Sequence, residues 1–308
     1  MPVLPGFPAP PILATAVVPW TARGEFDEPV FVRQVRTIAA HLTPHLYIFG
    51  TAGEGHAVSD RQFAQIAAAF RRCAADCGVR PMLGIISLSL ATIVERIELG
   101  RALGFREFQL SLPAWGALND VELDAFFAAT CGRFPDCSFL HYNLARAGRV
   151  LTADDYARLL PAHPNLVALK MSPKDPAVVA ALMRLAPRLR CYFTEFAYAD
   201  ARRSGPCGLL ASLSTVHPER ARAFVLGDDA TRAAMVPELQ AVAAALAAAN
   251  RGRFHIDGAF DKMLYRVHDP AFPLRLLPPY AGPGEDDFAR FLAALPAAWR
   301  PAPSFLSP

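Results

Sequence analysis

The sequence alternates eight times between a short apolar run and a longer amphipathic segment. The apolar runs are typical of buried parallel strands and cover residues 12–18, 46–50, 82–87, 107–112, 138–142, 166–170, 191–194 and 208–212. The amphipathic segments are typical of helices and cover residues 29–41, 60–75, 90–103, 120–131, 153–160, 176–185, 197–203 and 218–225. Eight strand-then-helix units predict an α/β fold, a (β/α)8 TIM barrel, because a doubly wound sheet usually carries only about five or six strands.

Residues that favour the start or end of a helix stand at the edges of these segments. Caps precede several of them, at Ser59 or Asp60, Ser89, Asn119 or Asp120, Thr152 and Asp175. Glycine follows two others, at Gly78 and Gly104. Beyond residue 226 the alternation stops, and helical patterns at about 229–250, 257–267 and 284–295 lead into a proline-rich tail. We therefore expect residues 1–226 to form the barrel that carries the active site and residues 227–308 to form a C-terminal helical domain.

The composition excludes several classes of protein. Charged residues make up 19% of the 308 residues and hydrophobic residues 53%, which is too apolar for intrinsic disorder. The 31 basic and 28 acidic side chains leave a net charge of +3 spread along the chain, so we expect no nucleic-acid partner. No run approaches the roughly 20 apolar residues of a membrane span. Prolines at positions 2, 5, 8, 10 and 11 break any signal-peptide helix, and we expect a soluble, cytoplasmic protein without a membrane partner.

Cysteine and histidine show no spacing that is typical of metal ligands. The six cysteines form no CxxC pair, and Cys73 and Cys77 share a helix face, where packing is the usual role. His41 and His45 are also four residues apart, but Pro44 interrupts the helix that joint ligation would need. We expect no metal site.

Lysine is rare in this chain, which carries only Lys170, Lys174 and Lys262 among its 31 basic residues. Lys170 ends an apolar run, at the carboxyl end of a predicted barrel strand, where the reactive groups of such barrels lie. A desolvated amine favours its neutral form and can then attack a ketone, which arginine cannot do. We interpret Lys170 as a nucleophile that forms a Schiff base; the alternative is a lysine that points into solvent.

Two further features belong with Lys170 at the predicted strand ends. Tyr142 ends the preceding strand, where its phenol can shuttle protons; the alternative is a tyrosine that caps the core. The GTAGEG turn at residues 50–55 can direct backbone N–H groups at a small anion, although an ordinary turn has the same composition. Arg146 can reach a substrate carboxylate or lie on the solvated surface.

In this order and spacing, these residues resemble the dihydrodipicolinate synthase / N-acetylneuraminate lyase family of pyruvate-dependent class I aldolases. VPW at 18–20 and GEFD at 24–27 are similar to the family's opening TPF…G…D pattern, and GTAGE at 50–54 is similar to GTTGE. YN at 142–143 is similar to YNxP, and Lys170 stands at the imine position. GPCGLLAS at 205–212 is similar to a late GxxG segment.

The resemblance implies a TIM barrel with a C-terminal helical domain, assembled as a homotetramer or dimer, and a lyase that needs no cofactor. Lys170 would form an imine with pyruvate or another 2-keto acid, Tyr142 would move protons, and the Thr51 region would hold the carboxylate. An aldehyde would be the second partner of the aldol reaction. The implied substrate-binding residues are Gly50, Ala52, Gly53, Trp115, Arg146 and Leu210.

Departures from the family pattern concern the acceptor side. Ala52 replaces a second hydroxyl residue, and Trp115 stands near the place of a tyrosine that reaches a neighbouring subunit's site in the synthase. The proline of YNxP is absent, and Arg146 matches the substrate-binding arginine only with a gap. We therefore expect imine chemistry but not dihydrodipicolinate synthase activity itself. PAW at 113–115 is similar to a PxW of the aromatic hydratase-aldolase branch, which makes that activity one alternative; a non-catalytic barrel that binds a keto acid is another.

Overall fold

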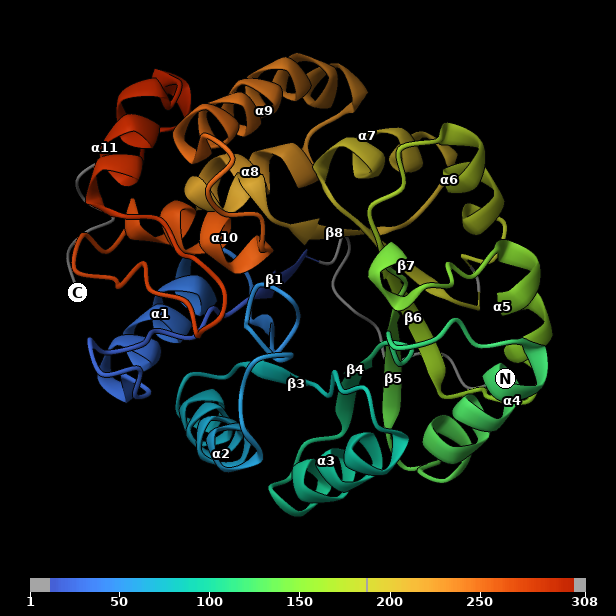
Figure 1. Cartoon of the computed structure of the whole chain (residues 1–308). Coiled ribbons are helices and arrows are strands. Elements are labelled where there is room, and N and C mark those ends of the chain that lie inside the picture. The colour runs from blue at the N-terminus through green and yellow to red at the C-terminus, as the bar shows by residue number, and fades with distance from the viewer. Residues whose placement is uncertain (1–11, 187, 302–308) are drawn as a thin grey trace. The chain divides into compact units, whose positions relative to one another are not determined.

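The computed structural model describes residues 12–186 and 188–301. The N-terminal prolines and the end of the proline-rich tail lie outside these residues. Eight parallel strands close into a barrel in chain order, which confirms the predicted fold (Figure 1). The strands are β1 Ile12–Thr15, β2 His45–Ile48, β3 Arg80–Gly84, β4 Glu107–Leu110, β5 Ser138–Tyr142, β6 Leu166–Met171, β7 Arg190–Phe193 and β8 Gly208–Ala211.

A helix follows each strand, and further helices follow the barrel. The barrel helices are α1 Glu28–His41, α2 Asp60–Asp76, α3 Leu90–Ala102, α4 Asp120–Phe127, α5 Ala153–Leu159, α6 Pro176–Met183, α7 Glu195–Ser204 and α8 Pro218–Leu226. The later helices are α9 Asp229–Asn250, α10 Asp257–Arg266 and α11 Glu285–Ala294. Four short helices, η1 Ala128–Gly132, η2 Ala145–Ala147, η3 Leu213–Val216 and η4 Ala297–Trp299, connect these elements or end the described chain.

The predicted caps lie where the helices begin. The side chains of Ser59, Ser89, Asn119, Thr152 and Asp175 each accept a hydrogen bond from the first turn of the following helix. Gly78 and Gly104 follow α2 and α3 with φ of 65° and 92°, which a glycine adopts without strain. The first strand is shorter than predicted, since it ends at Thr15. Val17 and Val18 are buried although they lie beyond the strand, and this burial accounts for the longer apolar run in the sequence.

The chain divides into two compact units. Among the described residues, unit 1 contains residues 12–13 and 81–210, and unit 2 contains residues 14–80 and 211–301. Unit 1 carries most of β3 to β8 with the helices between them. Unit 2 carries β2, the helices α1 and α2, and α8 to α11.

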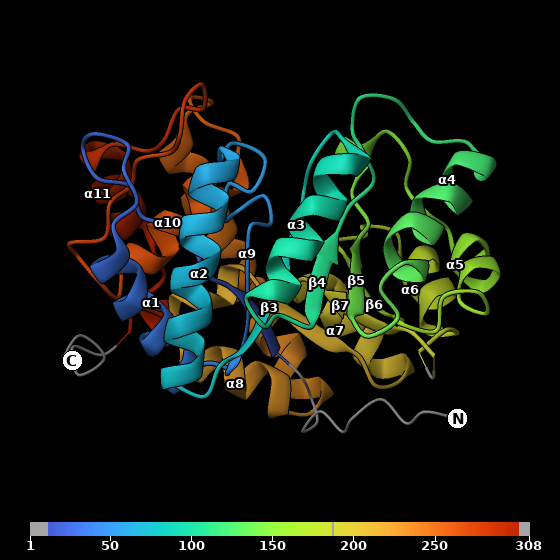
Figure 2. The same cartoon turned by 90° about the horizontal axis from the view of Figure 1, so that it is seen from below.

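Close packing fixes the strands of unit 1. On α3, a Cβ at Gly100 would lie 2.6 Å from the Phe108 ring of β4 and 2.9 Å from Leu83 of β3, so only glycine permits this approach. Figure 2 shows α3 alongside these two strands. Phe108 in turn stacks on Phe139 of β5, with ring centroids 5.9 Å apart. These contacts pack β3, β4 and β5 together and against α3.

The long helix α9 of unit 2 has the length and apolar composition of a membrane span. Among the described residues it is the one helix whose length and composition would allow it to cross a bilayer, with a mean hydropathy of 1.2 in the most apolar window. However, α9 packs against α11 (Figure 1), and its Glu238 accepts a hydrogen bond from the indole of Trp299. Leu239, Val242 and Leu246 are buried within the unit. One such helix is weak evidence for a membrane, and we interpret α9 as a packed helix of unit 2.

Candidate active site

Lys170 is a buried amine at the carboxyl end of β6. Lys170 is the last but one residue of this strand, and 4% of the residue is exposed. The Nζ atom donates a hydrogen bond to Oε1 of Gln109 at 3.3 Å and lies 3.8 Å from the centre of the Tyr142 ring. The amide and the aromatic face together fix the position of the amine.

Strand pairing brings Tyr142 to this position. In the β5–β6 ladder, Tyr142 is the direct partner of Lys170, so the two side chains leave neighbouring strands at the same level. The backbone N–H of Asn143 donates to the carbonyl oxygen of Lys170 at 2.9 Å, which extends the pairing by one residue. The structure therefore brings these two predicted residues together within unit 1.

Asn143 also anchors the chain beyond the strand end. Its buried side-chain amide donates to the carbonyl of Leu151 at 2.8 Å and accepts from the N–H of the same residue at 2.9 Å. This two-point contact holds the segment between β5 and α5 against the strand. The asparagine of the YN pair is thus a structural clamp next to the tyrosine.

Gln109 is a site residue that was not predicted from the sequence. It lies on β4, is fully buried, and its Nε2 has no hydrogen-bond partner among the described residues. A signal was present in the sequence. In the run EFQLSL at 107–112, Gln109 and Ser111 alternate with apolar residues, so two polar groups fall on one face of a strand that the barrel buries.

His141 lies on the opposite face of β5 from Tyr142. Its Nδ1 lies 2.7 Å from the Tyr156 hydroxyl of α5, and its ring packs edge-on against Phe127 of α4. Burial lowers the pKa of His141 to about 3, which keeps the imidazole neutral. His141 therefore belongs to the interface between strand and helices.

The other residues predicted in unit 1 differ in their exposure to solvent. Trp115 stands on the loop after β4 with 90% of the residue exposed. Arg146 is an exposed residue of η2, and Leu210 is a buried residue of β8. The Trp115 loop is tied to the segment before α5, because Arg149 donates to the carbonyl of Leu118 at 2.9 Å.

The GTAGEG turn after β2 lies in unit 2 and is buried throughout. Within it, the N–H groups of Glu54 and Gly55 donate to the carbonyls of Thr51 and Gly50 at 3.1 and 3.2 Å. A Cβ at Gly53 would lie 2.7 Å from the Phe49 nitrogen, so the turn is folded too tightly for a larger residue. The Ala52 side chain joins an apolar cluster with Val17, Tyr265 and Phe272.

Glu54 connects this turn to the C-terminal part of unit 2. It adopts φ of 56°, in the left-handed region, and its carboxylate is almost fully buried. That carboxylate accepts hydrogen bonds from Trp20 Nε1 at 2.8 Å, from Lys262 Nζ at 2.6 Å and from the N–H of Leu277 at 2.7 Å. Lys262 was not predicted as a functional residue, although the rarity of lysine distinguishes it as much as Lys170.

Cysteine and histidine do not form a metal site in the described residues, since no group of three suitable ligands lies together there. The thiols serve packing. Burial raises the pKa of Cys131 and of Cys191 to about 12, so both stay protonated near neutral pH.

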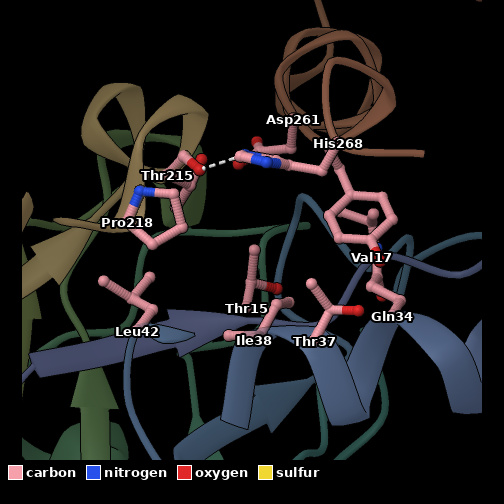
Figure 3. Close-up of a pocket in the computed structure, with 11 residues that line it drawn as sticks. Thr15, Val17, Gln34, Thr37, Ile38, Leu42, Thr215, Pro218, Asp261 and His268 are labelled. Atoms are coloured by element: carbon pink, nitrogen blue, oxygen red, sulfur yellow. Dashed lines mark hydrogen bonds between the residues drawn. The ribbon is translucent and has the colours of Figure 1, made fainter. Parts of the chain in front are cut away.

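Unit 2 also contains a small cavity of about 30 Å³, which Figure 3 shows. The hydrogen bond from His268 Nε2 to the carbonyl of Thr215, 2.9 Å long, crosses one side of it. The buried polar atoms of Thr15 and Gln34 that line it lack hydrogen-bond partners among the described residues. This volume suits one or two water molecules and is too small for a keto acid.

Comparison with known proteins identifies the family. The sequence pattern of the Dihydrodipicolinate synthetase family matches residues 10–253, and the chain belongs to this family. A 4-hydroxy-tetrahydrodipicolinate synthase of Exiguobacterium sibiricum is 25% identical over 266 residues, which cover 83% of this chain and 88% of that protein. A synthase of the same name from Prochlorococcus marinus is 27% identical over 206 residues, or 67% of this chain and 64% of the relative.

Solved structures show the same fold. A prophage protein of E. coli K12 from the dihydrodipicolinic acid synthase family, solved in complex with pyruvate, has a TM-score of 0.80 and 16% identity, covering 93% of this chain and 97% of that one. The N-acetylneuraminate lyase of Proteus mirabilis has a TM-score of 0.79 and 18% identity, with 94% and 98% covered. The relatives thus include lyases, and this chain has the fold of a lyase family.

Proposed function

We propose that this chain is a class I lyase that makes or breaks a carbon–carbon bond, or dehydrates, in a 2-keto acid such as pyruvate through an imine on Lys170. The observation that carries the proposal is the buried Lys170 amine held between Gln109 and the Tyr142 ring. Family membership supports it, because the relatives include lyases and one was solved with pyruvate.

The chemistry follows from those side chains. The neutral amine of Lys170 attacks the ketone carbon, and the carbonyl oxygen takes up a proton. Tyr142 supplies that proton, and loss of water then leaves the imine. The protonated imine acts as an electron sink for the neighbouring carbon. In synthesis that carbon loses a proton to the phenolate of Tyr142, and the resulting carbanion adds to an aldehyde, whose oxygen takes up the proton. In cleavage the substrate hydroxyl gives up its proton as the aldehyde leaves, and the carbanion takes up a proton before the imine is hydrolysed. Hydrolysis of the imine returns the amine and the keto acid.

Other residues bind the substrate in this proposal. The backbone of residues 50–53, with the Thr51 hydroxyl, holds the carboxylate, and Arg146 and Leu210 contribute to substrate binding. The Nε2 of Gln109, which has no hydrogen-bond partner in the described part of the chain, supplies a further donor beside the amine. No cofactor is required for these steps. We also infer a cytoplasmic location and a homotetramer or dimer, and light scattering of the purified protein tests the oligomeric state.

A second candidate is an aromatic hydratase-aldolase. The exposed Trp115 supports it, because an indole on the loop after β4 can stack on an aryl-substituted substrate. Dihydrodipicolinate synthase activity itself is not proposed, since the hydroxyl residue expected at Ala52 is absent and Ala52 packs into an apolar cluster instead.

The test is a cleavage assay on a panel of 4-hydroxy-2-keto acids with aliphatic, sugar-acid and aryl substituents. Pyruvate release is followed with lactate dehydrogenase and NADH, for the wild type and for Lys170→Ala. We expect the wild type to cleave one class of substrate and the variant to cleave none. Turnover that survives in Lys170→Ala would overturn the imine mechanism; binding of keto acids without turnover by the wild type would favour the non-catalytic barrel.

A further inference from the structure

We propose that the buried Glu54–Lys262 ion pair positions the turn at residues 50–55 and thereby sets the affinity of the protein for its 2-keto acid. This inference rests on the proposed function, since it concerns the turn to which that function assigns the substrate carboxylate. Glu54 and Lys262 touch no substrate in this proposal. They are positioning residues, and both lie in unit 2.

Several contacts converge on one carboxylate at the end of the turn. Glu54 accepts hydrogen bonds from an indole, an ammonium and a backbone N–H, at 2.6 to 2.8 Å. Lys262 in turn donates to the carbonyl oxygen of Arg275, and the side chains of the pair are 0% and 2% exposed. Three separate segments, around Trp20, α10 and Leu277, therefore fix the end of the turn.

These contacts maintain an unusual backbone conformation. Phe49 and Glu54, at the two ends of the turn, adopt φ of 60° and 56°, which non-glycine residues rarely adopt. Such conformations persist only where the surroundings enforce them, and they cluster at binding sites. The hydrogen bonds of Glu54 supply that enforcement at one end of the turn.

Helix α10 also contacts the turn directly. A Cβ at Gly258, in the first turn of α10, would lie 2.8 Å from the carbonyl oxygen of Ala52. The helix that carries Lys262 thus touches the backbone of the turn at a second point. Displacement of α10 would move Ala52 together with Glu54.

The chemistry of the pair also fits a positioning role better than a purely stabilising one. Burial lowers the pKa of Lys262 to about 8, although the carboxylate of Glu54 opposes this shift. Desolvation of two charges is costly, and apolar residues of similar volume often stabilise a fold as well as a buried pair does. What an ion pair adds is a fixed geometry, here at the edge of an anion-binding turn.

The test measures how pyruvate concentration governs the yield of Lys170 adduct after borohydride reduction. Two variants disturb the turn by different means: Lys262→Met removes the ammonium, and Gly258→Ala pushes on Ala52 while favouring the helix. Asp287→Asn is the matched control, because it removes another buried carboxylate of unit 2, which pairs with Arg253 and Arg290 and lies outside the turn.

We expect Lys262→Met to raise the half-saturating pyruvate concentration about tenfold and Gly258→Ala about threefold, with little change in the rate at saturation. The control should leave both quantities unchanged even if its melting temperature falls. Half-saturation within about twofold of the wild type in both turn variants would overturn the proposal. If Lys262→Met does not fold, Gly258→Ala decides alone.

A second readout separates this inference from the proposed function. Hydrogen exchange of the amides at residues 50–57 should be faster in both turn variants than in the wild type and in Asp287→Asn. A wild type that forms no adduct with any keto acid would overturn the proposed function, and the exchange rates would then decide the positioning role. Unchanged exchange at the turn would reject it.

Discussion

Two lysines are buried in this protein, and their surroundings assign them opposite roles. In unit 1, Lys170 contacts a neutral amide and the face of a phenol ring. In unit 2, Lys262 donates to the carboxylate of Glu54 and to a backbone carbonyl, and it is completely enclosed. Burial alone therefore does not identify a nucleophile; the neighbours of the amine do.

The pKa alone would also mislead. Burial lowers the pKa of Lys262 to about 8, which brings it close to the range in which an amine can react at neutral pH. Yet an amine engaged by a carboxylate at 2.6 Å in a site with no exposed surface has no route to a substrate. We therefore assign the role of nucleophile to Lys170 and a structural role to Lys262.

Replacement of Lys170 should have the largest effect on activity. Lys170→Met keeps the shape of the stem but removes the nucleophile, so turnover should fall by at least about 10³-fold. The free energy of unfolding should change by no more than about 1 kcal/mol, because methionine fills the same space without a buried amine. Steady-state kinetics and urea unfolding measure the two quantities. Strong destabilisation of Lys170→Met would contradict the view that Lys170, unlike Lys262, has no structural role.

The equivalent change at Lys262 should act on stability. Lys262→Met leaves the Glu54 carboxylate buried without its cation, which costs about 3–5 kcal/mol of unfolding free energy. Urea unfolding checks this value. The double variant with Glu54→Gln should recover part of the loss, since it removes the remaining buried charge. If the wild type and Lys262→Met had equal free energies of unfolding, the ion pair would not contribute to the stability of the fold.

Buried histidines extend the comparison to pH. Burial lowers the pKa of His141 in unit 1 to about 3 and of His268 in unit 2 to about 4. The unfolded chain binds protons at these imidazoles near pH 6.5 and the folded chain does not, so stability is complete above that pH and falls on acidification. For His141 the loss reaches roughly 4 kcal/mol near pH 3.

Urea unfolding at pH 7, 5.5 and 4 tests this pH dependence, with His141→Gln as the comparison, because glutamine keeps a hydrogen-bonding group for Tyr156 but does not titrate. Its stability should vary less with pH than that of the wild type. Parallel curves for the two proteins would contradict the assignment.

Tyr142→Phe should have the smallest of these effects. It keeps the ring over the Lys170 amine and removes only the phenol hydroxyl, so imine formation should slow by about 10²-fold while the fold is unaffected. The rate of borohydride-trapped adduct formation with pyruvate measures it. A rate equal to that of the wild type would assign the proton transfer to another group.

The barrel could be predicted from the sequence because its signals are local. Apolar runs, amphipathic segments and caps such as Ser59 and Thr152 each act within a few residues, and the strands and helices form where those signals stand. The pair Lys170 and Tyr142 could be predicted for a related reason. Both stand at the ends of consecutive strands, and neighbouring barrel strands pair in register.

The residues that were missed depend on contacts distant in sequence. Gln109 meets Lys170 across 61 positions, and Glu54 meets Lys262 across 208. No local pattern specifies such pairs. Two weaker signals were nevertheless present: the polar face of β4, and the rarity of lysine, which applied to Lys262 as well as to Lys170.

The most direct test of the central claim is to trap the imine. The wild type is incubated with pyruvate, reduced with borohydride and digested, and the modified peptide is located by mass spectrometry, with Lys170→Met and unreduced samples as controls. The predicted result is one pyruvyl adduct, on Lys170, that is absent from Lys262 and from the variant. An adduct on another lysine, or none from folded protein with pyruvate and larger 2-keto acids, would contradict the assignment of Lys170 as the nucleophile.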